Sequence, residues 1–136
     1  MCALGMSEEF RGEVAFNCLW PRTAIATAAI EMLAGKMGTK ASRSVDIMAD
    51  AAHWILSQPV AECTGNTFID DEVMTEKVGL SHSDLDRYRM SKTGLVPLMP
   101  DFYVGEPEKL EQYVDLARKL GGVAGAFVDT LKGKSR

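Results

Sequence analysis

The chain has 136 residues, of which 15 are basic and 19 acidic, for a formal net charge of −4. With 46% hydrophobic and 25% charged residues, its length and composition are those of an ordinary globular domain. The acidic balance argues against nucleic-acid binding, which needs a clustered basic surface. No apolar run approaches the roughly 20 residues of a membrane span. Charged residues within positions 1–19 also argue against a secretory signal.

Cysteine and histidine are sparse and scattered. The cysteines are Cys2, Cys18 and Cys63, and the histidines are His53 and His82. No pair of them has the short spacing typical of zinc ligands, so we expect no metal site. The odd cysteine count favours reduced thiols in an intracellular protein.

The first part of the chain predicts a helix, a strand and a second helix. Residues 1–10 predict the end of a helix that stops before a glycine. Residues 14–20 are apolar except for Asn17, which is the pattern of a strand buried on both faces in a parallel sheet. Residues 24–33 are rich in alanine and predict a helix that ends near Gly35.

A further helix and strand follow. Residues 35–39 predict a loop, and residues 45–56 predict a helix capped by Ser44. The apolar face of that helix consists of Ile47, Ala51, Trp54 and Ile55. A Thr-Gly-Asn turn then leads into a strand over residues 67–70. The order strand, helix, helix, strand predicts an α/β fold closed by a parallel, right-handed crossover.

The remainder of the chain is less regular. Residues 79–103 are polar and contain two prolines, so we expect an irregular surface segment with one helical turn capped by Ser81. Residues 106–136 carry two apolar stripes on either side of a glycine pair. They predict a helical hairpin, or a linker, that needs a partner surface.

The segment most informative about function is residues 17–27. A buried-type strand runs into Pro21, and a helix of small residues follows. In open α/β sheets, ligands bind where the carboxyl end of a strand meets the next helix, so Pro21, Thr23, Ile25 and Thr27 are candidate ligand contacts. A purely structural alternative stays open, in which Pro21 ends the strand, Thr23 caps the next helix and Thr27 bonds its own backbone.

Four segments, taken in order, resemble the hydroxysteroid dehydrogenase-like branch of the short-chain dehydrogenase/reductase family. They are Gly5–Phe10, Asn17–Ile25, Asp46–Ala52 and Thr64–Asp71. The Trp-Pro-basic-Thr-Ala-Ile run of the second segment is the most specific to the branch, and the Thr-Gly-Asn run of the fourth is common to the family. With a branch tail at Leu98–Tyr103, the resemblance covers residues 1–104.

The resemblance implies the C-terminal part of a doubly wound, Rossmann-type parallel sheet. Residues 14–20 and 67–70 would be its sixth and seventh strands, and residues 24–33 would be the mobile helix that closes over the substrate. The implied division is residues 1–78, part of an NAD(P)-binding domain; 79–105, an irregular family tail; and 106–136, a helical hairpin or linker.

The resemblance also implies a cofactor, NAD or NADP, with its nicotinamide beside Pro21, Thr23, Ile25 and Thr27. The family transfers hydride to or from a carbonyl or alcohol carbon, which implies a small, lipid-like or otherwise unassigned substrate and a homo-oligomeric enzyme. The glycine that usually follows the loop proline is replaced here by Arg22. The branch implies a mitochondrial or peroxisomal location, with the cytoplasm as an alternative.

The family's glycine-rich phosphate loop and its catalytic serine, tyrosine and lysine would lie before Met1, so we assign no catalytic residue. Tyr88 and Lys92 reproduce the spacing of the tyrosine–lysine pair, but they follow the last strand in a polar stretch, and we interpret them as coincidental. Two hypotheses remain. The chain is a fragment of an oxidoreductase that is not active alone, or it is a truncated, non-catalytic polypeptide that associates with intact subunits or other partners.

Overall fold

A computed structural model describes residues 2–101, which form two compact units. The first unit comprises the described part of Met1–Pro21 together with Asp46–Leu85. The second comprises Arg22–Val45 together with the described part of Asp86–Arg136. The predicted hairpin over residues 106–136 lies outside the described residues, and the division at residues 78 and 105 stays a prediction.

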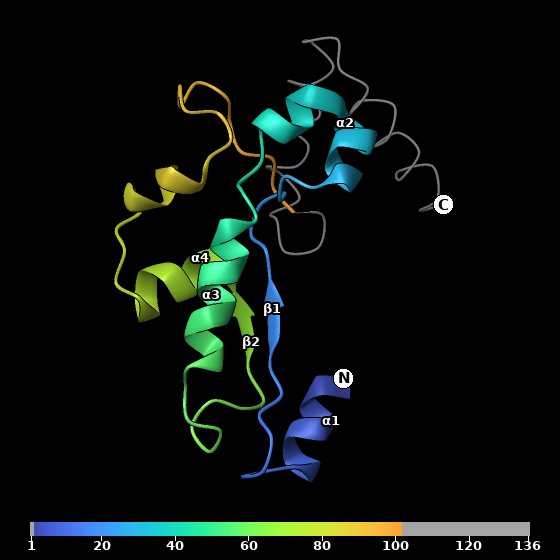
Figure 1. Cartoon of the computed structure of the whole chain (residues 1–136), viewed down its shortest axis with the longest axis vertical. Helices are drawn as coiled ribbons and strands as arrows, with labels where there is room; N and C mark the ends of the chain where they lie inside the picture. The colour runs from blue at the N-terminus through green and yellow to red at the C-terminus, as the bar shows by residue number, and fades with distance from the viewer. Residues whose placement is uncertain (1, 102–136) are drawn as a thin grey trace. The chain divides into compact units, whose positions relative to one another are not determined.

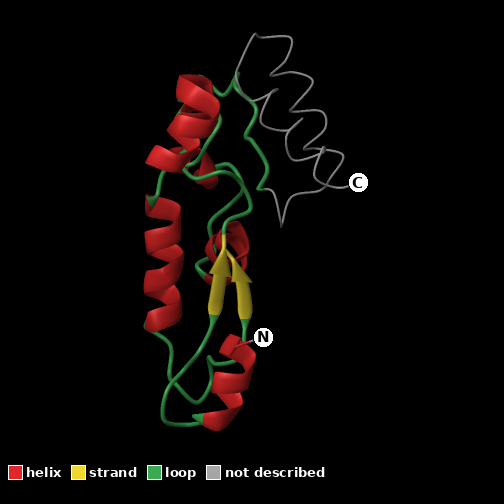
Figure 2. Ribbon diagram, turned by 90° about the vertical axis from the view of Figure 1, so that its right-hand side faces the viewer, coloured by secondary structure: helices red, strands yellow, loops and turns green. Residues whose placement is uncertain are grey.

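The first unit is built on a pair of parallel strands. Helix α1 (Cys2–Glu9) precedes β1 (Cys18–Trp20), which pairs in parallel with β2 (Thr67–Ile69) so that Leu19 lies opposite Phe68. Figures 1 and 2 show the two strands side by side and pointing the same way. The predicted α/β class and the predicted parallel pairing are confirmed.

One helix covers this strand pair. Helix α3 (Asp46–Leu56) buries Ile47, Ala51 and Ile55, which recur every four residues and therefore form one stripe. Trp54 lies on the same helix, and its ring meets the Phe68 ring of β2 edge-on, with centroids 6.2 Å apart and an interplanar angle of 81°. The predicted apolar face of this helix is confirmed.

The chain after β2 closes the core of the first unit. The short helix α4 (Asp70–Glu72) continues directly into a π-helix, η1 (Val73–Lys77), and both pack against α3. Val73 and Met74 are buried there. The sequence pattern does not predict these turns, because they are too short to show a helical period.

Strand β1 is shorter than predicted because the residues just before it, Phe16 and Asn17, bond to a turn and not to a neighbouring strand. The amide nitrogen of the Asn17 side chain donates to the Cys63 carbonyl at 2.8 Å. The Asn17 side-chain oxygen accepts from both the backbone and the side-chain nitrogen of Asn66, each at 3.0 Å. One asparagine therefore joins the start of β1 to the turn that leads into β2.

Backbone bonds strengthen the same junction. The Phe16 nitrogen donates to the Thr64 hydroxyl at 3.1 Å, and the Gly65 nitrogen donates to the Phe16 carbonyl at 2.8 Å. Gly65 has a φ of +75°, and a Cβ there would lie 3.0 Å from the hydroxyl of Ser7 on α1. A glycine is therefore required both by the backbone conformation and by the close approach of α1.

The second unit contains helix α2 (Ala28–Lys40), whose bounds differ from the prediction. The helix begins four residues later than the predicted Ala24, because the preceding residues are extended, and Thr27 is its N-cap. It also passes beyond Gly35, so the predicted loop over residues 35–39 is wrong. Gly35 interrupts the helix with a φ of 60° and a ψ of −161°, a conformation open mainly to glycine, and the chain then resumes helical turns.

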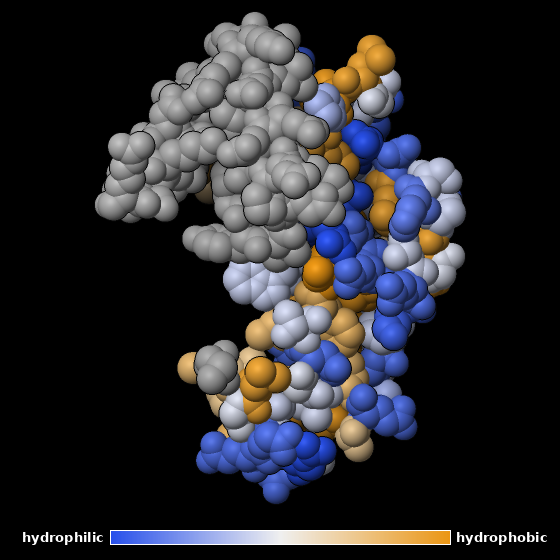
Figure 3. All heavy atoms as spheres, turned by 180° about the vertical axis from the view of Figure 1, so that it is seen from behind, coloured by the Kyte–Doolittle hydropathy of each residue, from blue (hydrophilic) through white to orange (hydrophobic). Residues whose placement is uncertain are grey.

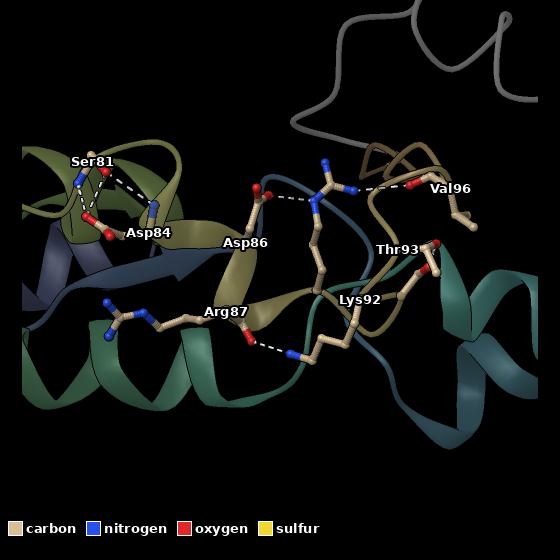
Figure 4. A network of polar contacts seen from close by, with 9 residues as sticks. Ser81, Asp84, Asp86, Arg87, Lys92, Thr93 and Val96 are labelled. Atoms are coloured by element: carbon tan, nitrogen blue, oxygen red, sulfur yellow. Dashed lines mark hydrogen bonds and ion pairs between the residues drawn. The ribbon is translucent and has the colours of Figure 1, made fainter.

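A short 3₁₀ helix, η2 (Asp84–Tyr88), lies where the predicted helical turn was expected. The Ser81 backbone nitrogen and hydroxyl both donate to the same Asp84 carboxylate oxygen, at 2.9 and 2.7 Å. The Asp84 nitrogen donates back to the Ser81 hydroxyl at 3.2 Å. Figure 4 shows this reciprocal cap, which confirms the capping role predicted for Ser81.

Several large apolar side chains of the first unit are only partly covered. Trp20 is 42% exposed and Val14 is 46% exposed, so the predicted burial on both faces of this strand is not seen. The face in Figure 3 likewise shows apolar residues interspersed with hydrophilic ones. The physical reason is that β1 has a single neighbour within the described sheet. In the part of the chain that the structure describes, no helix has the length and apolar character needed to cross a membrane.

The open edge of β1 predicts self-association of the isolated chain. Roughly three or more strands are needed for an independently stable sheet, and an apolar open edge favours pairing with other chains. We expect oligomers or aggregates in light scattering at increasing protein concentration, reduced by Trp20→Lys but not by Leu56→Lys, a residue 83% exposed at the end of α3. A monomer with a sharp, cooperative melt would contradict this.

The junction at Asn17 predicts a specific loss of stability. Asn17→Ala leaves the Cys63 carbonyl and the Asn66 nitrogen without their partner, which should lower the free energy of unfolding by about 1–3 kcal/mol. The exposed Glu62→Ala, next to the same turn, should change it by less than about 0.5 kcal/mol. Denaturant unfolding followed by tryptophan fluorescence at fixed protein concentration measures both. Equal midpoints for the two variants would show that water replaces the amide.

Candidate functional site

The candidate site is an extended stretch of the second unit, residues 22–26, which we call the loop segment. Its backbone bonds to two other segments of the chain. The Ala24 nitrogen donates to the Met99 carbonyl at 2.9 Å, while the Ala24 carbonyl accepts from the Arg43 nitrogen at 3.0 Å. The Ala26 nitrogen donates to the Arg43 carbonyl at 2.8 Å. These bonds fix the backbone of the residues that the sequence predicts to contact a ligand.

Thr23 is the most unusual residue of this stretch. It faces Pro100 in an antiparallel bridge and is 8% exposed. Its hydroxyl is buried and has no hydrogen-bond partner among the described residues. A buried hydroxyl without a partner costs about 1–3 kcal/mol. Such a group is a candidate for bonding to a ligand.

Thr27 has a different role. It is exposed, and its hydroxyl accepts the backbone N–H of Ile30 at 3.5 Å as the N-cap of α2. The structural alternative in which Thr23 caps the next helix is therefore wrong, because Thr27 caps it instead. The two threonines, both candidate contacts from the sequence with Thr27 the weaker of them, are separated by burial and by hydrogen bonding.

The other two candidates are Pro21 and Ile25. Pro21 directly follows β1 and belongs to the first unit, whereas Ile25 is half-buried in the second unit and bridges Arg43 in parallel. Ile25 and Thr23 are two residues apart on an extended chain, so their side chains leave the same face. Cofactor contact by Pro21, Thr23, Ile25 and Thr27 stays a prediction.

Residues 96–101 contact the loop segment, whereas the sequence indicates only a family tail at Leu98–Tyr103 and no contact with that segment. Met99 is 4% exposed and packs in a small apolar cluster with Ala24 and Ala41, joined by Ile30 and Val96. The available signal was the pair of prolines, because residues that precede proline favour extended backbone. That bias indicates a conformation but not a partner.

Tyr88 and Lys92 do not lie on a common helix. Tyr88 is the last residue of η2, and the Lys92 ammonium donates to the Arg87 carbonyl at 2.8 Å (Figure 4). A tyrosine–lysine pair that acts on a carbonyl needs a firm helix to align both groups. This geometry therefore favours the interpretation of the pair as coincidental.

No family model matches the chain, but curated proteins similar to it are known. It is 53% identical over 128 residues to hydroxysteroid dehydrogenase-like protein 2 of Xenopus tropicalis, a match that covers 93% of this chain and 28% of that protein. It is 43% identical over 116 residues to the protein of that name from Homo sapiens, covering 85% of this chain and 26% of the relative. The chain thus spans about a quarter of the length of these curated relatives.

Solved structures of dehydrogenases are also similar to this chain. A putative dehydrogenase from Xanthomonas campestris superimposes with a TM-score of 0.65 at 41% identity, over 76% of this chain and 36% of that chain. A short-chain dehydrogenase from Mycobacterium thermoresistibile gives 0.62 at 37% identity, over 78% of this chain and 38% of that one. The predicted resemblance to part of a short-chain dehydrogenase is confirmed. The two parallel strands accordingly correspond to part of a Rossmann-type sheet.

The cysteines do not form a site within the described residues. Cys2 is exposed, Cys18 is half-buried and Cys63 is buried, and all three are free thiols. Burial raises the pKa of the Cys63 thiol, which lowers its thiolate fraction. The described part of the chain contains no cluster of three or more His, Cys, Asp or Glu side chains that could hold a metal ion.

The difference in burial predicts selective alkylation. At pH 8, iodoacetamide should modify Cys63 more than about tenfold more slowly than Cys2, because both access and thiolate fraction are reduced. Because the pKa of Cys63 is higher in the folded state than in the unfolded state, the protonated thiol stabilises the fold. That stabilisation is present below the unfolded-state pKa and is lost as the pH rises through the folded-state pKa. Peptide mass spectrometry measures the rates, and denatured protein, in which the rates should converge, is the control. Equal rates in the folded protein would refute burial of Cys63.

Proposed function

We propose that the chain supplies the nicotinamide-side loop and the substrate-covering helix of an NAD(P)-dependent oxidoreductase. The reaction is hydride transfer between the cofactor and a carbonyl or alcohol carbon. The loop corresponds to the loop segment with its flanking Pro21 and Thr27, and the covering helix corresponds to α2. The chain is not active alone, because the residues that would hold the pyrophosphate and protonate the carbonyl oxygen are not among its own.

The observation that supports this proposal is the buried hydroxyl of Thr23, placed in the segment that resembles the family's cofactor loop. A nicotinamide carboxamide offers both a hydrogen-bond donor and an acceptor, and a threonine hydroxyl can bond to either. The nicotinamide carboxamide therefore fits the hydrogen-bonding capacity of Thr23. When bound, the cofactor would supply the hydride, while the role of Thr23 is to orient the carboxamide.

Substitutions of Thr23 and Thr27 should have different effects on stability and on cofactor affinity. Thr23→Val removes the buried hydroxyl but keeps its shape, so stability without cofactor should stay equal or rise by up to about 1–2 kcal/mol. In a full-length protein that also contains the phosphate loop, the same change should weaken NAD(P)H binding by about tenfold. Thr27→Val should instead cost about 1 kcal/mol of stability through loss of the cap and weaken binding less than Thr23→Val does.

Fluorescence titration with NADH and with NADPH measures the affinities, and thermal melts measure the stabilities. If the full-length protein binds neither NADH nor NADPH, the proposed function is wrong. Unchanged affinity in the Thr23 variant would remove Thr23 from the site.

The substrate class, assembly and location form part of the same proposal. The relatives are named as hydroxysteroid dehydrogenase-like. That name supports a small, lipid-like carbonyl or alcohol substrate for this chain. We propose in addition a homo-oligomer in the mitochondrion or the peroxisome, with the cytoplasm as the alternative location. The nicotinamide preference, NAD or NADP, is an outcome of the titration above.

A second candidate function is favoured by the edge of β1 that has no neighbour among the described strands, and by the partly exposed apolar residues of the first unit. Such a surface suits a non-catalytic polypeptide that associates with intact subunits. The size of the native protein, detected with an antibody against residues 106–119, separates the two. A band about twice the size of this chain, or larger, supports the oxidoreductase, and a band at its own size supports the associating polypeptide.

A further inference from the structure

We propose that residues 96–101, here called the tail segment, hold the loop segment in its ligand-ready shape, with Met99 as a positioning residue that does not itself touch the cofactor. This inference rests on the proposed function for its effect on cofactor binding. Its structural half, the control of the loop backbone by Met99, stands independently of any cofactor. Both segments lie in the second unit.

The first support is the hydrogen bonding between the two segments. The Met99 carbonyl accepts from the Ala24 nitrogen at 2.9 Å, and the Asp101 nitrogen donates to the Arg22 carbonyl at 3.0 Å. These bonds flank the bridge between Thr23 and Pro100. The residue with the buried, unpartnered hydroxyl is thus held on both sides by the tail segment.

The position of Pro100 fits this arrangement. Proline has no backbone N–H, and within an antiparallel pair it is tolerated only where no donor is required. The flanking bonds make Thr23 and Pro100 a non-hydrogen-bonded pair, so the missing donor costs nothing. Proline also biases the preceding Met99 towards extended backbone, which lowers the entropy lost when the tail segment is ordered.

The second support is packing. The Met99 side chain is 4% exposed and lies against Ala24 and Ala41, and the Met99 nitrogen donates to the Ala41 carbonyl at 2.8 Å. Met99 therefore contacts the loop segment and the end of α2 at once. Met99 is the largest of the three buried residues of this cluster, since the other two are the alanines Ala24 and Ala41.

The third support is an anchor at the other end of the tail segment. Arg89 donates from Nη1 to the Val96 carbonyl at 3.1 Å and from Nε to an Asp86 carboxylate oxygen at 2.7 Å. Figure 4 shows Asp86 and Val96 joined to the same guanidinium group. Arg89 also bridges Arg43, the backbone partner of Ile25 in the loop segment. The tail and loop segments are therefore joined through two separate routes.

The test begins with hydrogen exchange. Met99→Ala should speed exchange of the amides of residues 22–26 by about tenfold or more, while residues 16–20 and 63–69 of the first unit keep their rates. Leu95→Ala, in a residue that precedes the tail segment and is 86% exposed, is the matched control and should change neither. Met99→Leu, which keeps the volume, should restore wild-type exchange. Val96→Ala, a smaller truncation in the same cluster, serves where Met99→Ala does not fold.

Cofactor affinity completes the test, using NADH and NADPH with the full-length protein. Met99→Ala should raise the Kd about tenfold while turnover at saturating cofactor stays near wild type, because bound cofactor reorders the loop segment. Unchanged exchange at residues 22–26, or an equal rise in both units, would overturn the proposal. Changed exchange with unchanged affinity would overturn the positioning role. If the wild type binds neither cofactor but the exchange result holds, the proposed function fails while the tail segment keeps its structural role.

Discussion

The side-chain amide of Asn17 is the interaction on which the first unit depends. Parallel strands are joined by a long crossover, so no hairpin turn fixes their register. Here the asparagine binds the turn at Cys63 and Asn66 just before β2 and so sets where β2 begins relative to β1. A slip of one residue would reverse the face of every side chain on the strand, and Phe68 would no longer meet Trp54 of α3.

The second unit solves a different problem without a regular sheet. A buried stretch of extended backbone needs partners for its N–H and C=O groups. Residues 99–101 provide them for the Arg22 carbonyl and the Ala24 nitrogen, and Arg43 provides them for the Ala24 carbonyl and the Ala26 nitrogen. The shape of the loop is therefore determined by residues distant in sequence. This arrangement suits a binding loop, because a backbone fixed before binding loses less entropy when a ligand arrives.

The sequence predicted the parts of this structure in which local pattern and packing agree. Helix α3 has a complete apolar stripe, and its buried residues Ile47, Ala51 and Ile55 follow that stripe. The start of α2 was missed because the alanines before Thr27 have high helix propensity, yet their backbone pairs with Met99 and Arg43. Composition likewise could not separate Thr23 from Thr27, since only burial and hydrogen bonding distinguish them. Isolated bridges such as Thr23–Pro100 leave no periodicity to detect.

The buried hydroxyl of Thr23 has a consequence for selectivity at the proposed site. The hydroxyl has no partner among the described residues, and the backbone nitrogen and carbonyl of the neighbouring Ala24 already bond to Met99 and Arg43. The desolvation cost of the Thr23 hydroxyl is therefore present before any ligand binds. A ligand with a polar group at that point recovers the cost, whereas an apolar ligand of the same shape leaves it in place. Sites built this way reject the analogue that lacks the hydrogen bond more effectively than an apolar pocket rejects an added methylene. The loop segment would therefore discriminate by chemistry at Thr23 and by shape at Ile25, and both depend on the backbone order that Met99 and Arg43 provide.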